Sequence, residues 1–172
     1  GGLAGSSSPN GGGIDIYNSS PIVAHVTIRD NSVYWLGPAM KIYAESSPIF
    51  ADVIIKNHSH GGGGGGAVSI EHGPASHPTF SNVLFINNNA FAIQTWEGSP
   101  ILSYVTMFGN EGGAGEQINL QNGSELRVNN SIIWNDNDLS IRNPGYVESI
   151  TYSDIDGGWE QLFAFNVVPQ ID

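Results

Sequence analysis

The feature that most constrains the fold is a phrase that recurs along most of the chain. It appears as SSPIVAHVTIRDN at 19–31, SSPIFADVIIKNH at 46–58, SHPTFSNVLFINN at 76–88 and GSPILSYVTMFGN at 98–110. The proline of the phrase falls at Pro21, Pro48, Pro78 and Pro100, so successive copies are 27, 30 and 22 residues apart. A phrase repeated at such periods predicts equivalent turns of chain stacked on one another.

A fifth copy, GSELRVNNSIIWN at 123–135, has lost the proline. We align Glu125 at the proline position, 25 residues after Pro100. This alignment places Arg127 in the position of Leu102 and Ile132 in the position of Met107.

A short alternating segment precedes each copy and predicts a strand. These segments read GIDIY, AMKIY, AVSIE, AIQTW and QINLQ. Because side chains alternate across a strand, one set is expected in the core: Ile14, Ile16, Met40, Ile42, Val68, Ile70, Ile93, Thr95, Ile118 and Leu120. The other set is expected to face solvent. Thr95 is the one polar residue of the inner set.

The pattern predicts an all-β, parallel β-helix of about six turns. Charged residues make up only 12% of the chain and 23 residues are glycine, which favours short strands and turns over helices. We expect a single domain over 1–172, with a partial first turn at 1–10, repeat turns at 11–160 and a C-terminal tail or cap at 161–172. LSIR at 139–142 is expected to begin the sixth turn.

Asparagine dominates one column of the repeat. The residues ten positions after each anchor are Asn31, His58, Asn88, Asn110 and Asn135. Stacked amides form hydrogen bonds along the coil axis, and Asn tolerates the left-handed conformation of a corner. We predict a structural ladder along this column.

Three segments, GGGIDIYNSSP at 11–21, NSIIWNDND at 130–138 and YSDIDGGW at 152–159, resemble right-handed parallel β-helix repeat proteins of the pectate-lyase-like superfamily. Such repeats are common in secreted and cell-surface bacterial proteins. The resemblance covers residues 11 to 160 and implies a right-handed coil in an extracellular or cell-surface protein. It says little about activity, since this coil serves lyases, hydrolases, adhesins and structural proteins.

Composition excludes several classes of function. Five Lys and Arg stand against sixteen Asp and Glu, for a net charge of −11, so nucleic acid and anionic membranes are not expected partners. The chain has no cysteine, which excludes disulfides, cysteine zinc sites and thiol catalysis. No apolar run approaches ~18 residues, so no membrane span is expected. The opening GGLAGSSSPN lacks signal-peptide features, and we expect a mature or excised form.

The outward strand face is the candidate binding surface. It carries three rings flanked by charges and amides: Asp15, Tyr17, Lys41, Tyr43, Gln94, Trp96, Asn119 and Gln121. Sugar C–H groups stack on rings while hydroxyls bond to polar groups, so a glycan or a protein partner would fit. The alternative is that stacked rings only stabilise the sheet. Asp15 and Lys41, on adjacent turns, are expected to form a surface ion pair.

Cation sites are a second expectation. Asp136, Asp138, Asp154 and Asp156 lie in acidic loops of neighbouring turns, where oxygen ligands suit Ca²⁺; solvated loops are the alternative. Four of the five histidines surround the hexaglycine at 61–66. His58 belongs to the asparagine column, whereas His60 is expected in an extra loop. Their spacing predicts no specific metal, and no cofactor other than Ca²⁺ is expected.

These observations favour a non-catalytic extracellular β-solenoid with a structural or adhesive role. We expect self-association, end to end or as a filament subunit, or stacking on flanking repeats of a longer chain, with glycans as a further contact. The alternative is a polysaccharide lyase or glycoside hydrolase, or a fragment of one. The resemblance would then imply an acidic Ca²⁺ cluster with an Arg or Lys base, and Glu45 and Glu97, two turns apart, are conceivable as an acid and base pair.

Overall fold

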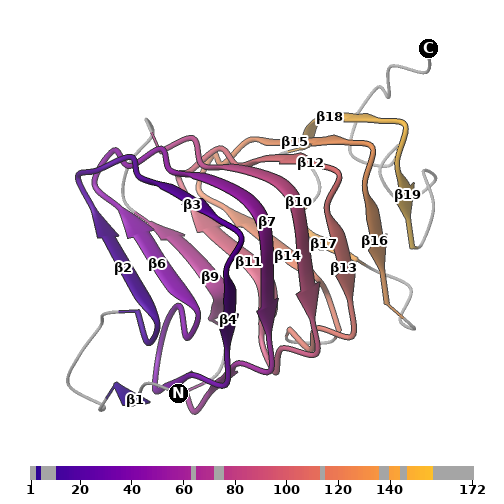
Figure 1. Cartoon of the computed structure of the whole chain (residues 1–172). Coiled ribbons are helices and arrows are strands. Elements are labelled where there is room, and N and C mark those ends of the chain that lie inside the picture. The colour runs from indigo at the N-terminus through magenta and orange to yellow at the C-terminus, as the bar shows by residue number, and fades with distance from the viewer. Residues whose placement is uncertain are drawn as a thin grey trace.

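The computed structural model describes residues 3–4, 11–62, 65–71, 76–112, 115–135, 140–143 and 147–156. Within these ranges the chain forms strands and turns and no helix. Each turn of chain passes through the same strand positions, and its strands pair in parallel with those of the next turn (Figure 1). The predicted all-β parallel coil is confirmed.

One wall of the coil is a six-stranded sheet in the order β17-β14-β11-β9-β6-β2. Its strands are β2 (Ile14–Tyr17), β6 (Met40–Tyr43), β9 (Gly66–Glu71), β11 (Phe91–Trp96), β14 (Ile118–Gln121) and β17 (Ile141–Arg142). Each of the five predicted strand segments lies in this sheet. The short β17 is where the sixth turn was expected to begin.

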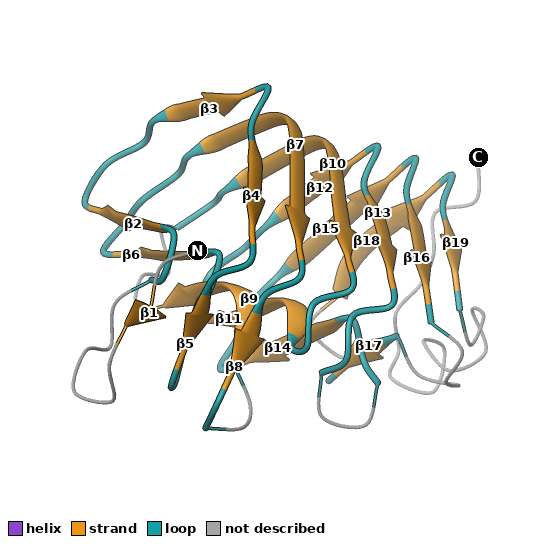
Figure 2. Cartoon of the chain, turned by 60° about the horizontal axis from the view of Figure 1, so that its bottom comes forward, coloured by secondary structure: helices purple, strands orange, loops and turns teal. Residues whose placement is uncertain are grey.

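The other two walls belong to one ten-stranded sheet that bends along its length (Figure 2). Two long strands, β7 (Ile49–Lys56) and β10 (Thr79–Ile86), run through both halves. The first half also holds β3 (Ile22–Ala24), β12 (Ile101–Ser103), β15 (Leu126–Asn129) and β18 (Val147–Thr151). The second half also holds β4 (Thr27–Arg29), β13 (Thr106–Phe108), β16 (Ile132–Trp134) and β19 (Asp154–Ile155).

A column of left-handed residues makes the bend between the two halves. Asp52 within β7 and Asn82 within β10 have φ of 55° and 53°, and Tyr104, between β12 and β13, has 55°. Asn and Asp adopt this conformation at modest cost. One residue of this kind per turn redirects the chain from one wall to the next.

A small third sheet, in the order β1-β5-β8, closes the corner after β4 and β7. It consists of β1 (Leu3–Ala4), β5 (Ser32–Val33) and β8 (Ser59–His60). His60 therefore pairs with Val33 in a strand, and its expected place in an extra loop is wrong. The cause is that Ser32–Val33 and Ser59–His60 follow the asparagine column at the same offset, so both continue the repeat.

The interior contains stacked apolar columns. Of the inner residues predicted for the six-stranded sheet, those from Met40 to Leu120 are fully buried, which confirms the assignment. Opposite them, the rings of Phe50 and Phe80 stack with centroids 4.9 Å apart. The one polar member, Thr95, is satisfied because its hydroxyl bonds to the Gly98 carbonyl at 3.0 Å and contacts Ser124 Oγ at 3.2 Å.

Side-chain ladders hold two corners of the coil. In the asparagine column, the Asn31 N–H donates to His58 Nδ1 at 3.2 Å, the His58 N–H to Asn88 Oδ1 at 3.0 Å, and the Asn88 N–H to Asn110 Oδ1 at 3.2 Å. Asn135 instead donates from its side chain to the Gly115 carbonyl and from its backbone to Asp156. The ladder thus joins the first four members of the column.

A serine ladder at the corner after the six-stranded sheet was not anticipated. The Ser19 N–H donates to Ser46 Oγ at 3.1 Å, and the Ser46 N–H donates to Ser76 Oγ at 3.2 Å. The serine two residues before Pro21, Pro48 and Pro78 is its sequence signal. Each hydroxyl satisfies a backbone donor that the strand ladder leaves unpaired.

The register of the fifth copy differs by one residue from the predicted alignment. Leu102 pairs with Val128, and Met107 with Ile133, rather than with Arg127 and Ile132. Arg127 points outward and binds Glu148, with its Nε 2.6 Å from the carboxylate. Burying a guanidinium in an apolar column would be costly, so the apolar neighbours take the inner positions.

Candidate functional site on the outer face of the six-stranded sheet

The outward side chains of the six-stranded sheet form the surface that the sequence singled out, here called the polar face. The strand register places them in two rows. One row is Asp15, Lys41, Ser69, Gln94 and Asn119, and the other is Tyr17, Tyr43, Glu71, Trp96 and Gln121. All eight residues predicted for the binding face therefore lie together on one side of one sheet.

Most of the polar face is not exposed, contrary to the expectation that it faces solvent. Lys41 is only 7% exposed, Gln94 6% and Asn119 4%, whereas Tyr17 is 63% exposed. Strand alternation separates the two faces of a sheet, but it does not say what lies against each face, and parallel sheets are commonly covered on both. The accessible part is a rim that includes Asp15, Tyr17, Tyr43 and Trp96.

The expected ion pair has a different partner. Lys41 Nζ lies 3.0 Å from Glu71 Oε2, and both side chains are more than nine-tenths buried. Glu71 is the diagonal neighbour of Lys41, since Lys41 is level with Ser69 in the next turn and Tyr43 with Glu71. A buried charge requires a partner, and the long lysine side chain reaches the diagonal carboxylate.

Asp15 engages Tyr43 instead. Burial raises the pKa of the Tyr43 phenol above its usual value, and the charge of Asp15 with its hydrogen bond to the phenol adds to this effect. The Lys41 ammonium lies 4.8 Å from the centroid of the Tyr43 ring, and the Tyr17 ring lies 5.0 Å from that of Tyr43. The first turns of the polar face thus hold one connected network of charges and rings.

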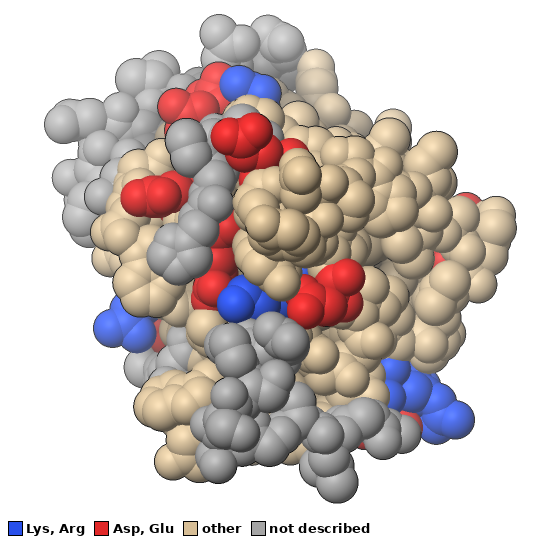
Figure 3. Space-filling view, turned by 90° about the vertical axis from the view of Figure 1, so that its left-hand side faces the viewer, with Lys and Arg blue, Asp and Glu red and all other residues tan. Residues whose placement is uncertain are grey.

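Figure 3 looks onto the end of the coil nearest β2. On this face, Lys or Arg atoms at the centre lie between groups of Asp and Glu atoms.

Lys41 is the one lysine of the polar face, and its Nζ is in contact with the Glu71 carboxylate. Among the residues that the structure describes, no three His, Cys, Asp or Glu side chains form a metal-binding group. Gln94 Oε1 is buried without a hydrogen-bond partner among those residues.

The acidic loops proposed for Ca²⁺ are only partly described. Asp136 and Asp138 lie outside the described residues. Asp154 is exposed at the start of β19, and Asp156 Oδ2 accepts the Asn135 N–H at 3.2 Å. The calcium site stays a prediction.

Strand alternation places Glu71 on the outward face, but its pairing with Lys41 was not anticipated. It occupies the row that holds tyrosine or tryptophan at Tyr17, Tyr43 and Trp96. A single carboxylate within a column of rings, one turn from a lysine, is the signal that could have identified it.

Comparison with protein families matches residues 12–153 to the family described as the right-handed β-helix region. The chain belongs to the right-handed β-helix family. No match was found among curated proteins or among solved structures. In the described part of this β-helix, no helix has the length and apolar character needed to cross a membrane.

Proposed function

We propose that this right-handed β-helix is a non-catalytic structural or adhesive module of an extracellular or cell-surface protein. The observation that carries the proposal is the buried Lys41–Glu71 pair at 3.0 Å. The one lysine of the polar face is engaged in this internal contact. The polar face therefore offers its aromatic rings and its shape to a partner rather than a free amine that could act as a base. The module needs no cofactor for this role.

Glycans are the proposed ligands of the rim. Tyr17 is 63% exposed and lies 5.0 Å from the Tyr43 ring, with Asp15 beside it. Rings present flat apolar surfaces to sugar C–H groups, and a carboxylate accepts hydrogen bonds from hydroxyls. Trp96 continues the row two turns further on.

Binding to a panel of immobilised neutral and uronate-containing polysaccharides tests this proposal. We expect Tyr17→Ala and Trp96→Ala each to weaken retention by about tenfold, which corresponds to ~1.4 kcal/mol. Tyr152→Ala is the matched control, because Tyr152 is 66% exposed at the bend of the ten-stranded sheet. Equal loss in all three variants, or no binding by the wild type, would contradict a glycan role for the rim.

A polysaccharide-active enzyme is the second candidate. It is favoured by the two carboxylates, Asp15 and Glu71, that lie on the turns either side of Lys41. Incubation with uronate-rich and neutral polysaccharides, with and without Ca²⁺, would reveal unsaturated products or new reducing ends. Turnover that Asp15→Asn abolishes would replace the non-catalytic proposal.

For partners, we propose end-to-end contact with another copy or with flanking repeats. Val26 in the first turn is 37% exposed, whereas its equivalents Val53 and Val83 are 1% and 2% exposed. A further turn stacked on β2, β3 and β4 would cover it and pair the edges of these strands that have no partner among the described residues. Electron microscopy at high protein concentration tests this, and uniformly single particles would contradict it.

A further inference from the structure

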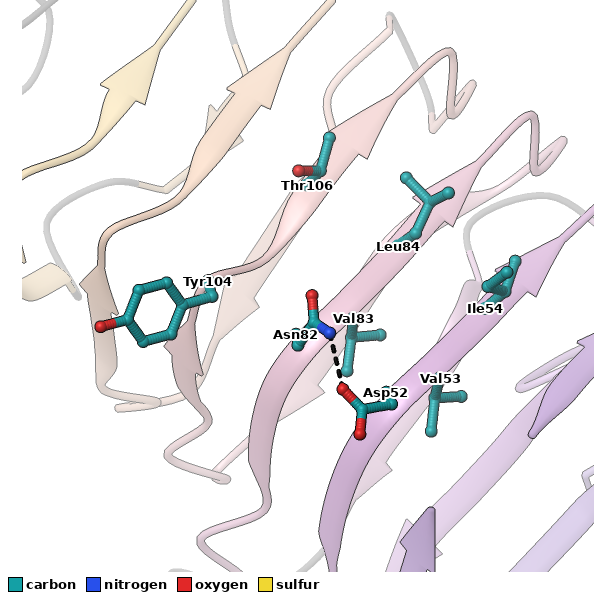
Figure 4. Close-up of a pocket in the computed structure, with 8 residues that line it drawn as sticks. All are labelled: Asp52, Val53, Ile54, Asn82, Val83, Leu84, Tyr104 and Thr106. Atoms are coloured by element: carbon teal, nitrogen blue, oxygen red, sulfur yellow. Dashed lines mark hydrogen bonds between the residues drawn. The ribbon is translucent and has the colours of Figure 1, made fainter. Parts of the chain in front are cut away.

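The outer face of the second half of the ten-stranded sheet is apolar and exposed. Its outward side chains form what we call the apolar face: Ile54, Leu84, Ile86, Phe108, Ile132 and Trp134. Phe108 is 45% exposed, Ile132 50% and Trp134 42%. Figure 4 shows Ile54 and Leu84 side by side with Thr106 on three neighbouring strands. These exposed apolar side chains lie next to one another on one wall of the coil, so they form a candidate contact surface, although a patch of this size also occurs on monomeric proteins.

The two ends of the apolar face carry opposite charges. Arg29 and Lys56 continue its outer row over the first two turns. At the other end Asp154 is level with Ile132, and Asp156 follows β19. Arg29 also contacts Asp30, at 3.1 Å and in an exposed position, where such pairs exchange readily with other partners. The face is therefore basic at one end, apolar in the middle and acidic at the other.

We propose that the apolar face binds the same face of a second copy of this chain, with the two coils antiparallel. A face-to-face pair has a two-fold axis in the plane of contact. If that axis is parallel to the strands, each row of outward side chains along the coil lies over the same row of the second copy. The order of the turns is then reversed between the two copies. Asp154 of one copy then lies over Thr27 of the other, beside Arg29 on the same strand, so an acidic side chain meets a basic one. The Asp156 carboxylate accepts the Asn135 N–H within its own chain.

The alternative two-fold axis, along the coil, keeps the copies parallel and gives poorer complementarity. It would place the acidic ends of the two copies against each other and the basic ends against each other. Like charges in contact disfavour such an arrangement. Charge thus selects the antiparallel pair.

The antiparallel pair also matches side chains in the middle of the face. Lys56 of one copy lies over Trp134 of the other, which suits a cation–π contact. Ile86 meets Phe108, and Ile54 meets Ile132. A hollow of about 440 Å³ between Tyr104, Leu84 and Thr106 lies at the margin of the face and offers room for a ring of the second copy.

The size of the face predicts a weak dimer. The six strands of this half of the sheet, at ~4.8 Å spacing and with about three residues each, give a patch of roughly 24 Å by 10 Å. This is well below the ~800 Å² per partner of a standard stable interface. We expect a concentration-dependent dimer with Kd on the order of 100 µM.

Sedimentation velocity of the whole chain, from about 10 µM to about 1 mM, brackets that affinity and tests the proposal. We expect dimer formation by the wild type, and at least tenfold weaker association in Ile54→Glu and Phe108→Glu. The matched control is Ile49→Glu, because Ile49 is on the same strand β7 and similarly exposed, 44% against 37%, but faces outward from the other half. Circular dichroism establishes that each variant is folded.

A wild type that stays monomeric throughout, or a dimer that survives Ile54→Glu and Phe108→Glu, overturns the proposal. Equal loss in Ile49→Glu also overturns it. Orientation has its own test, since the chain has no cysteine. Mixing Thr27→Cys and Asp154→Cys proteins under oxidation should give the mixed disulfide in excess, whereas dominant Thr27→Cys homodimers would show a parallel pair and overturn the antiparallel geometry.

The apolar face lies on a different wall of the coil from the rim proposed for glycans. Ile54→Glu is expected to leave polysaccharide retention unchanged, and Tyr17→Ala is expected to leave the dimer unchanged. Failure of one proposal is thereby distinguishable from failure of the other.

Discussion

Two outer faces of the same coil reverse the usual relation between polarity and exposure. On the polar face, Lys41 and Glu71 are buried, whereas on the apolar face Phe108 and Trp134 are more than two-fifths exposed. Both faces lie outside the same apolar interior. The exposure of the outward side chains of a β-helix therefore depends on what packs against each wall. Their polarity varies independently of the apolar side chains in the interior.

This independence has a structural basis. The inner columns and the backbone pairing between turns hold the coil together, with residues such as Phe50, Ile70 and Leu102 fully buried. Outward side chains contribute less to that packing, so polar and apolar residues are both compatible with the fold. Substitutions on the two faces should differ in their effect on stability accordingly.

The largest effect is expected from breaking the buried pair on the polar face. Lys41→Met leaves the Glu71 carboxylate buried without its cation, which should lower the free energy of unfolding by about 3–5 kcal/mol. Urea denaturation followed by circular dichroism measures this change. Lys41→Met combined with Glu71→Leu should recover most of the loss, because an apolar pair needs no charge compensation.

The exposed Arg127–Glu148 pair provides the matched control. It has similar geometry, with Arg127 Nη2 2.9 Å from Glu148 Oε1, but lies at the surface. Arg127→Met should have little effect on unfolding. If Lys41→Met were equally mild, the polar face would be open to water in solution and the contrast between the faces would fail.

An intermediate effect is expected from pH, through a buried histidine of the asparagine column. Burial lowers the pKa of His58, partly opposed by its hydrogen bond to the Ile28 carbonyl. The unfolded chain takes up a proton near pH 6.5, and the folded chain does so only at lower pH. The contribution of His58 to the free energy of unfolding is therefore fully present above pH 6.5 and decreases as the pH falls below that value. For a chain of this size, each 1 kcal/mol lost lowers Tm by about 2–4 °C.

Thermal unfolding at pH 7.5 and 5.5 measures this dependence. His58→Asn, which copies Asn88 of the next turn, should reduce it, while the exposed His77→Asn should retain it. An unchanged pH dependence in His58→Asn would show that the buried histidine is not its source.

The smallest effect on stability is expected on the apolar face. Phe108→Thr removes an exposed ring from a strand and replaces it with a β-branched residue, so we expect a change within ~0.5 kcal/mol in the monomer at low concentration. Dilute thermal unfolding tests this. A loss of several kcal/mol would mean that Phe108 supports the fold, and the distinction between the two faces would then need revision.

Much of the fold could be predicted from the repeated phrase. The phrase ending in Asn31, His58, Asn88 and Asn110 located the turns, and strand alternation identified Met40, Ile42 and Ile70 as interior residues. Such columns are readable because stacking places like residues at like positions. The register predicted for the fifth copy was wrong by one residue, because that copy lacks the proline that marks the anchor and burial of Leu126 and Val128 sets the register instead.

The candidate site was predictable in membership but not in its contacts. The eight residues on the outward face were correctly grouped, since alternation assigns them to one side of a strand. The partner of Lys41 was wrong because sequence position favours the directly opposite Asp15, whereas side-chain reach and burial favour the diagonal Glu71.

By itself the sequence determined that this chain coils into parallel turns with an apolar interior, because that arrangement is fixed by local alternation and by a repeat that needs no distant information. Only the tertiary structure decided which outer rows are buried and which are exposed, and which charges pair. Those outcomes depend on what lies across each wall and on how far each side chain reaches, and neither is encoded in the spacing of residues along a strand.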